Sequence, residues 1–140
     1  MRDGKLNPDV RSLPGVQDLV DVPATVFYNS LAWVFNGADS YAQAVVSVLQ
    51  RFFLDPNHGI DPSINFGQVI RGPGKQMGQY LGVLDFRAMV KVVNAVQVLR
   101  LSNAPAWTPE IDAAMTAWVK QYTNWVETSA IGVKASNAAK

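Results

Sequence analysis

Apolar residues recur at helical spacing in four separate segments, and this periodicity constrains the fold more than any other feature of the sequence. One stripe runs at intervals of four, three and four residues: Tyr41, Val45, Val48 and Phe52. A second runs at intervals of four, three, four and three: Ile111, Met115, Trp118, Tyr122 and Trp125. Such intervals place side chains on one face of an α-helix. The spacing predicts an all-α chain with helices over 23–36, 40–54, 86–101 and 109–128.

Residues typical of helix ends flank the first two segments. Pro23 suits the first turn of a helix, and Gly37 suits the position just beyond its C-terminus. Asp39 or Ser40 can cap the second helix. Pro56 is expected to end that helix, because proline lacks the backbone N–H that a continuing helix needs.

The third segment, Asp85 to Leu101, is apolar nearly all round, so we expect a helix that is buried on several sides. Its seventeen residues contain no breaker and are too many for one strand. The fourth helix starts at Thr108 and Pro109, a capping hydroxyl followed by a first-turn proline. We expect it to end between Ser129 and Gly132, and the last five residues, SNAAK, to be a featureless tail. Short links between successive helices predict antiparallel hairpins.

A long segment without helical periodicity, Phe52 to Asp85, separates the second and third predicted helices. It is rich in glycine and proline, and it contains the only histidine of the chain. Loops of this length in a compact domain are usually functional or disordered. Its many apolar residues favour an ordered loop that packs. We therefore predict a ligand-binding surface whose polar groups are Asn65, Gln68, Arg71 and Lys75.

Three of these polar groups have alternative structural interpretations. The Arg71 side chain precedes Gly-Pro-Gly, where a tight backbone can aim its guanidinium at a planar carboxylate. An ion pair with Asp85 or Asp55 explains the same residue equally well. Asn65 and Gln68 can present their amides to one ligand, or they can simply satisfy backbone groups of the loop.

The sequence contains little that indicates catalysis or metal binding. His58 lies in a Pro-Asn-His-Gly turn without a serine or cysteine partner, so we expect an exposed loop histidine. Asp55 and Asp61 flank it without a recognised metal spacing, and we expect no metal or other cofactor. The GPGK run at 72–75 is too short for a phosphate-binding loop and indicates a turn. The helical spacing of Trp118 and Trp125 favours core packing over stacking on sugars.

Composition excludes several classes of function. With 140 residues and 49% apolar residues, the chain is one domain or part of one. A net charge of +1 without a basic run argues against nucleic acid or an anionic membrane as partner. The absence of cysteine excludes disulfides and thiolate metal sites. The first residues do not resemble a signal peptide, and no apolar run is long enough to span a bilayer.

The order of several short motifs resembles the alginate-lyase-type polysaccharide lyases, most closely the fungal members. Members of this family carry a leading RDG-x-x-NP, an FLDP turn, an aromatic-x-Q stretch, a Leu-Asp helix opening and a Y-x-x-W-x-x-TS-x-x-G close. The matching residues here are Arg2-Asp3-Gly4, Asn7-Pro8, Leu54-Asp55-Pro56, Asn65-Phe66-Gly67-Gln68, Leu84-Asp85, Tyr122, Trp125, Thr128-Ser129 and Gly132. The resemblance covers essentially the whole chain.

The resemblance implies an (α/α) toroid of helical hairpins whose inner helices line a cleft for an acidic, uronate-containing polysaccharide. It also implies β-elimination, which needs an amide or arginine on the uronate carboxylate, a base such as histidine or tyrosine, and a tyrosine-like acid. The substrate-binding candidates are Asn65, Gln68, Arg71 and Arg2. A secreted or periplasmic location is implied as well.

The sequence departs from the family pattern in ways that bear on activity. The family's Asn-Asn-His motif, which supplies the carboxylate-binding amide and the base, is expected just after the chain's last residue, Lys140. His58 does not fall at that position, and Asp61 stands where asparagine is usual. We therefore expect residues 1–140 to be an incomplete toroid that is inactive alone and associates with itself. The alternative is a non-catalytic helical module that binds acidic sugar or a protein partner.

Overall fold

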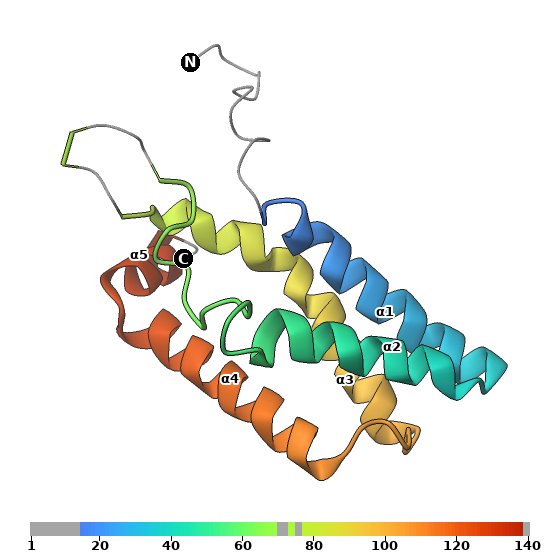
Figure 1. The fold of residues 1–140 in the computed structure, drawn as a ribbon. Coiled ribbons are helices and arrows are strands. Elements are labelled where there is room, and N and C mark those ends of the chain that lie inside the picture. The colour runs from blue at the N-terminus through green and yellow to red at the C-terminus, as the bar shows by residue number, and fades with distance from the viewer. Residues whose placement is uncertain (1–14, 70–72, 75–76, 139–140) are drawn as a thin grey trace.

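The computed structural model describes residues 15–69, 73–74 and 77–138. These residues form helices and no strand, which confirms the all-α prediction (Figure 1). In chain order the elements are α1 (Asp18–Asn36), α2 (Asp39–Leu49), the π-helical turn η2 (Gln50–Leu54), the 3-10 helix η3 (Tyr80–Met89), α3 (Val90–Leu101), α4 (Pro109–Thr128) and α5 (Ala130–Ala138).

Helix α1 begins at Asp18, so the predicted start at Pro23 is wrong. Pro23 lies inside the helix and is fully buried. A proline in a helix interior loses a backbone hydrogen bond at a cost of about 3 kcal/mol, and burial of its ring in the core offsets part of that loss. The predicted end is confirmed, because Gly37 has a φ of 68° and its N–H donates to the Trp33 carbonyl at 2.8 Å.

Helix α2 begins without the side-chain cap that the sequence predicted. Its N-cap is Ala38, and neither Asp39 nor Ser40 serves as the cap. Asp39 lies in the first turn instead, where a carboxylate stabilises the positive end of the helix dipole. The expected end before Pro56 is confirmed, because η2 extends the helix to Leu54 and Asp55 is extended.

The third predicted helix has two parts, η3 and α3, and it begins at Tyr80, earlier than expected. Asp85 therefore lies inside η3 and not at a helix N-terminus. Helix α3 buries one face, formed by Val92, Ala95, Val96 and Leu99. The expectation of burial on several sides is wrong, because Val90, Val93 and Leu101 are exposed.

The start of α4 is confirmed, and the tail after it is more ordered than predicted. The Thr108 hydroxyl oxygen accepts a hydrogen bond from the Ile111 N–H at 3.4 Å, and Pro109 follows the cap. Residues 130–138 form α5, so the prediction of a featureless tail is wrong for residues 136–138, while residues 139–140 lie outside the described residues. The Ser129 hydroxyl accepts from the Gly132 N–H at 2.9 Å and caps this helix. Gly132 packs so closely on Val126 that no side chain fits there.

A polar cluster ties the end of α3 to the start of α4. One oxygen of Asp112 accepts from the Arg100 guanidinium at 2.5 Å and from the Trp107 indole N–H at 2.7 Å. The Arg100 guanidinium also donates to the Thr116 hydroxyl at 3.2 Å. The hydrogen bonds to Asp112 hold the pKa of its carboxyl below its usual value, and the bond from Arg100 has the largest effect. The cluster therefore fixes the start of α4 to the end of α3.

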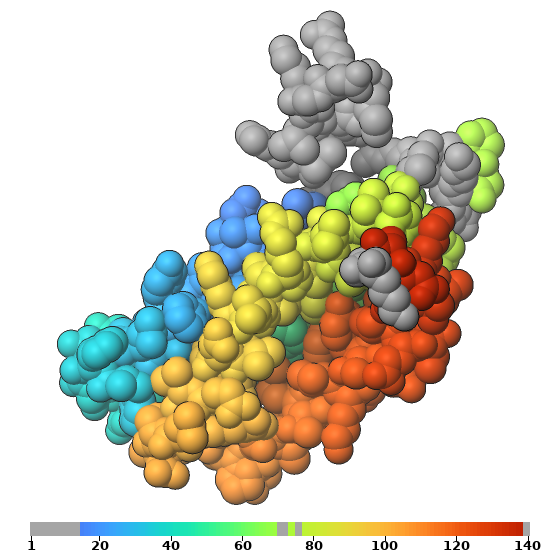
Figure 2. All heavy atoms as spheres, turned by 180° about the vertical axis from the view of Figure 1, so that it is seen from behind, coloured from blue at the N-terminus to red at the C-terminus, as the bar shows by residue number. Residues whose placement is uncertain are grey.

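Helices α1 and α2 form an antiparallel hairpin (Figure 1), and the helices pack around one core. Helix α1 lies against both α2 and α3, and Figure 2 shows α1 and α3 side by side on one face of the molecule. Helix α4 contacts η2. The centre is aromatic: the Trp118 ring lies 4.8 Å from Phe53 edge-on and 6.2 Å from Phe86 in a stack, measured between ring centroids. This core joins α4 to the rest of the bundle.

Candidate functional site

Three glycines close the base of the loop between η2 and η3. We call Gly67, Gly78 and Gly82 the glycine clasp. The Gly78 N–H donates to the Asn65 carbonyl at 2.6 Å, and the Gln79 N–H donates to the Gly67 carbonyl at 2.9 Å. A Cβ on Gly82 would lie 2.7 Å from three backbone atoms of Gly67. Such an approach is open only to glycine, so the clasp fixes where the flanking residues 65 and 68 lie.

Side-chain amides complete this base. The Gln79 amide nitrogen donates to the Gln68 carbonyl at 3.0 Å, and the Gln68 amide nitrogen donates to the Asp85 carboxylate at 3.0 Å. Gln68 has a φ of 51°. A residue other than glycine in this left-handed region is strained by about 1–3 kcal/mol, and such strain clusters at functional sites. These two hydrogen bonds hold Gln68 in that conformation.

Helix α4 holds the loop through two indole groups. The Trp118 indole N–H donates to the Ile60 carbonyl at 3.1 Å, and the Trp125 indole N–H donates to the Asn65 amide oxygen at 2.9 Å. The ring of Tyr122 is stacked between these two rings, at 5.9 Å from Trp118 and 6.1 Å from Trp125. Burial raises the pKa of the Tyr122 phenol. The row of aromatic rings therefore positions the loop residue Asn65.

The two predicted amides lie at this base but do not act as a matched pair. Asn65 is bonded to Trp125 and Gln68 to Asp85, so neither of these bonds goes to the loop backbone. Gln79, which the sequence analysis did not single out, satisfies the backbone carbonyl instead. Trp125 was assigned to the core by its spacing, and that spacing gave no sign of its loop partner. Arg2, Arg71 and Lys75 lie outside the described residues.

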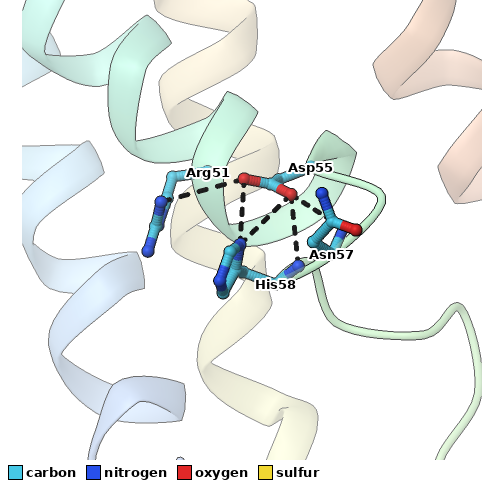
Figure 3. Close-up of polar contacts among 4 residues, drawn as sticks. All are labelled: Arg51, Asp55, Asn57 and His58. Atoms are coloured by element: carbon cyan, nitrogen blue, oxygen red, sulfur yellow. Dashed lines mark hydrogen bonds and ion pairs between the residues drawn. The ribbon is translucent and has the colours of Figure 1, made fainter.

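A second polar cluster surrounds Asp55 (Figure 3). Its carboxylate accepts from the backbone N–H groups of Asn57 at 2.8 Å and His58 at 3.2 Å, and it lies 3.3 Å from the His58 ring nitrogen and 3.8 Å from the Arg51 guanidinium. The Asn57 N–H contributes most to a lowered pKa of the Asp55 carboxyl. The prediction of an exposed histidine is confirmed, because 58% of the His58 side chain is exposed. The carboxylate caps a turn, beside a shallow surface depression.

The described ranges contain neither a group of metal-ligating side chains nor a membrane-spanning helix. In residues 15–69, 73–74 and 77–138, no three histidine, aspartate or glutamate side chains are grouped so that they could hold a metal ion. None of the helices in the same ranges is both long and apolar enough to cross a membrane.

Comparison with known proteins gives a family and a structural neighbour. The alginate lyase family profile matches residues 1–140. The crystal structure of an alginate lyase from Bacteroides ovatus is similar, with a TM-score of 0.86 and 31% sequence identity over 94% of this chain. The match covers 34% of that solved chain, so the present chain spans about a third of its length. No curated protein matches the chain significantly.

Proposed function

Because this chain belongs to the alginate lyase family, we propose that it is part of an enzyme that cleaves a uronate-containing polysaccharide by β-elimination. The family match over residues 1–140 carries this proposal. We further propose that its helical hairpins are one portion of an (α/α) toroid, since they superpose on about a third of a longer alginate lyase. An enzyme that acts on an extracellular polymer has to be exported, so a secreted or periplasmic location belongs to the same proposal.

β-Elimination defines what such a site must supply. A base removes the proton from C5, next to the uronate carboxyl, and the electrons form a C4–C5 double bond as the C4–O glycosidic bond breaks. An acid returns a proton to the departing oxygen. Hydrogen-bond donors on the carboxylate stabilise the charge that develops when the proton leaves. We assign sugar-binding roles to Asn65 and Gln68; Arg71 and Arg2 stay predictions from the sequence.

We expect the 140-residue chain to bind a uronate polymer without cleaving it. Its single histidine is hydrogen-bonded to Asp55 on an exposed turn, and the base of the loop consists of amides and aromatic rings. Binding is measured by retardation in a gel that contains alginate, with a neutral polysaccharide as control. Cleavage is measured as growth of absorbance from the new double bond. Turnover clearly above a heat-killed control would contradict the expectation, and its loss in His58→Ala would make His58 catalytic.

A second candidate function is favoured by apolar side chains that are exposed on α1 and α3. Phe35 and Leu101 are each 82% exposed, and Tyr28, Val90 and Val93 are more than half exposed. Exposed apolar patches larger than a few hundred Å² indicate association. This surface supports the alternative of a non-catalytic helical module that binds a protein partner or a second copy of the chain.

We expect the isolated chain to self-associate and to bind a hydrophobic dye through this surface. Phe35→Asp should lower dye binding and shift sedimentation toward the monomer, because it replaces the most exposed ring of α1. Asn36→Asp adds the same charge at the next position without removing apolar area, and it should leave both measurements unchanged. A monomer with little dye binding before any substitution would contradict the prediction.

A further inference from the structure

Helices α1 and α3 have a fixed register relative to each other. They lie side by side and run in the same direction, and η3 also packs against α1 (Figures 1 and 2). The Lys91 ammonium of α3 lies 5.9 Å from the centre of the Tyr28 ring of α1. Residues 28 and 91 are therefore at about the same level along the bundle. Because both helices rise equally per residue, residue 34 lies at about the level of residue 97.

Exposed apolar side chains follow both helices. We give the name α1–α3 face to Val20, Tyr28, Val34 and Phe35 of α1 and Val90, Val93 and Leu101 of α3, which are all exposed. Phe35 and Leu101 are the most exposed large apolar side chains in the described part of the chain, and each lies in the last turn of its helix. The two aromatic rings alone expose roughly 200–300 Å². With five aliphatic side chains, the face reaches the several hundred Å² that mark a site of association.

The two helices of this face carry charges of opposite sign. Asp18 and Asp21 are the charged residues of α1, whereas Lys91 and Arg100 are those of α3. Arg100 is paired with Asp112 of α4, so Lys91 is the cation beside the apolar side chains. Packing of α1 on α1 of a second copy would join helices that carry only acids. Packing of α1 on α3 joins opposite charges, and complementary charges favour this arrangement.

A two-fold axis parallel to the helices produces this arrangement twice. It places α1 of each copy on α3 of the other, so the same face is used by both copies, as an isologous interface requires. It also keeps every residue at its own level along the bundle. The last turn of α1 in one copy therefore meets the last turn of α3 in the other, and the exposed Phe35 and Leu101 side chains approach each other.

We infer that the α1–α3 face is the contact surface of a homodimer in which α1 of each copy packs on α3 of the other. This inference rests on the second candidate function, association through the exposed apolar side chains, and it names the partner and the arrangement. Burial of apolar area drives the association, whereas exposed charge pairs contribute little free energy and select the orientation.

Leu101→Asp tests the use of α3. Leu101 is exposed at the last position of its helix, so aspartate there should leave the melting temperature nearly unchanged. In a symmetric dimer it places two carboxylates in the apolar contact. The dissociation constant from sedimentation equilibrium should rise by at least about tenfold. Val133→Asp is the matched control, because it replaces an exposed apolar residue of α5 outside the face and should leave the dimer unchanged.

Cross-linking between single cysteines tests which helices meet. The chain contains no cysteine, so each introduced thiol reports only its own position. Val34→Cys and Gln97→Cys place thiols at exposed positions of α1 and α3 that lie at about the same level. When the two variants are mixed with a short thiol cross-linker, the 34–97 product should exceed the 34–34 and 97–97 products by more than random pairing gives. Adding Leu101→Asp to both variants should abolish this excess.

The outcomes separate this inference from the second candidate function. If Leu101→Asp associates as tightly as the unaltered chain, or if the 34–34 product dominates, the inference is overturned while self-association stands. A weaker association in Val133→Asp than in Leu101→Asp would also overturn it, because the contact would then involve α5. If the unaltered chain is a monomer with little dye binding, the second candidate function fails, and this inference fails with it.

Discussion

Trp118→Ala is expected to lower the free energy of unfolding by about 3–5 kcal/mol, the range for truncation of a buried tryptophan. Trp118 is 8% exposed and contacts Phe53 and Phe86, which come from η2 and η3. Its loss leaves a cavity where α4 meets the rest of the bundle. It also leaves the Ile60 carbonyl without its indole partner. Urea denaturation followed by circular dichroism measures the change.

Two further substitutions show whether the loss comes from packing at this position. Trp118→Phe keeps a ring but removes the indole N–H, so it should cost less than the alanine variant. Val119→Ala removes an exposed side chain from the next position of α4 and should change stability by about 0.5 kcal/mol or less. A cost of Trp118→Ala no greater than that of Val119→Ala would contradict the description of this core.

Gly82→Ala should open the glycine clasp. The new Cβ would lie 2.7 Å from the Cα, carbonyl carbon and oxygen of Gly67. These are backbone atoms, which cannot rotate away as the end of a side chain can, so the two chain segments of the loop base, at Gly67 and Gly82, must separate. Overpacking of this kind costs about 1–3 kcal/mol and occasionally more. Because Asn65 and Gln68 flank Gly67, uronate binding should be lost together with stability.

Gly74→Ala is the control within the same loop. Gly74 has a φ of 72°, so alanine is strained there, but a Cβ would meet no atom within 4 Å. The cost should be limited to backbone strain of roughly 1–2 kcal/mol, and uronate affinity should persist. Melting temperature and oligosaccharide affinity are measured on both variants. Retained binding in Gly82→Ala would show that the clasp does not position the amides.

The parts of the fold that the sequence predicted depend on local chemistry. The Thr108 cap, the left-handed Gly37 and the stop before Pro56 each follow from a few neighbouring residues. The predictions failed where packing outweighs local preference. Pro23 is accepted inside α1 because its ring is buried, and the short helix α5 forms where Gly132 can pack directly on α4.

The site depends on pairs that are distant in the sequence. The contact between Trp125 and Asn65 joins residues 60 positions apart, and that between Asp85 and Gln68 joins residues 17 apart. Helical spacing predicts the face of α4 on which Trp125 lies, but it cannot predict that Asn65 of the loop contacts this face. The loop, its ordered base and two of its amides were therefore predictable, whereas the direction in which each amide donates was not.

Chemical-shift mapping with a uronate oligosaccharide tests the central claim most directly. The nitrogen-15-labelled chain is titrated, and the residues whose signals move are identified. We predict that shifts concentrate at residues 64–68 and 79–85 and at the Trp125 indole N–H, with the Asp55–His58 turn and the exposed face of α1 unaffected. Shifts centred on the Asp55–His58 turn or on α1, or no shifts at saturating oligosaccharide, would contradict the account.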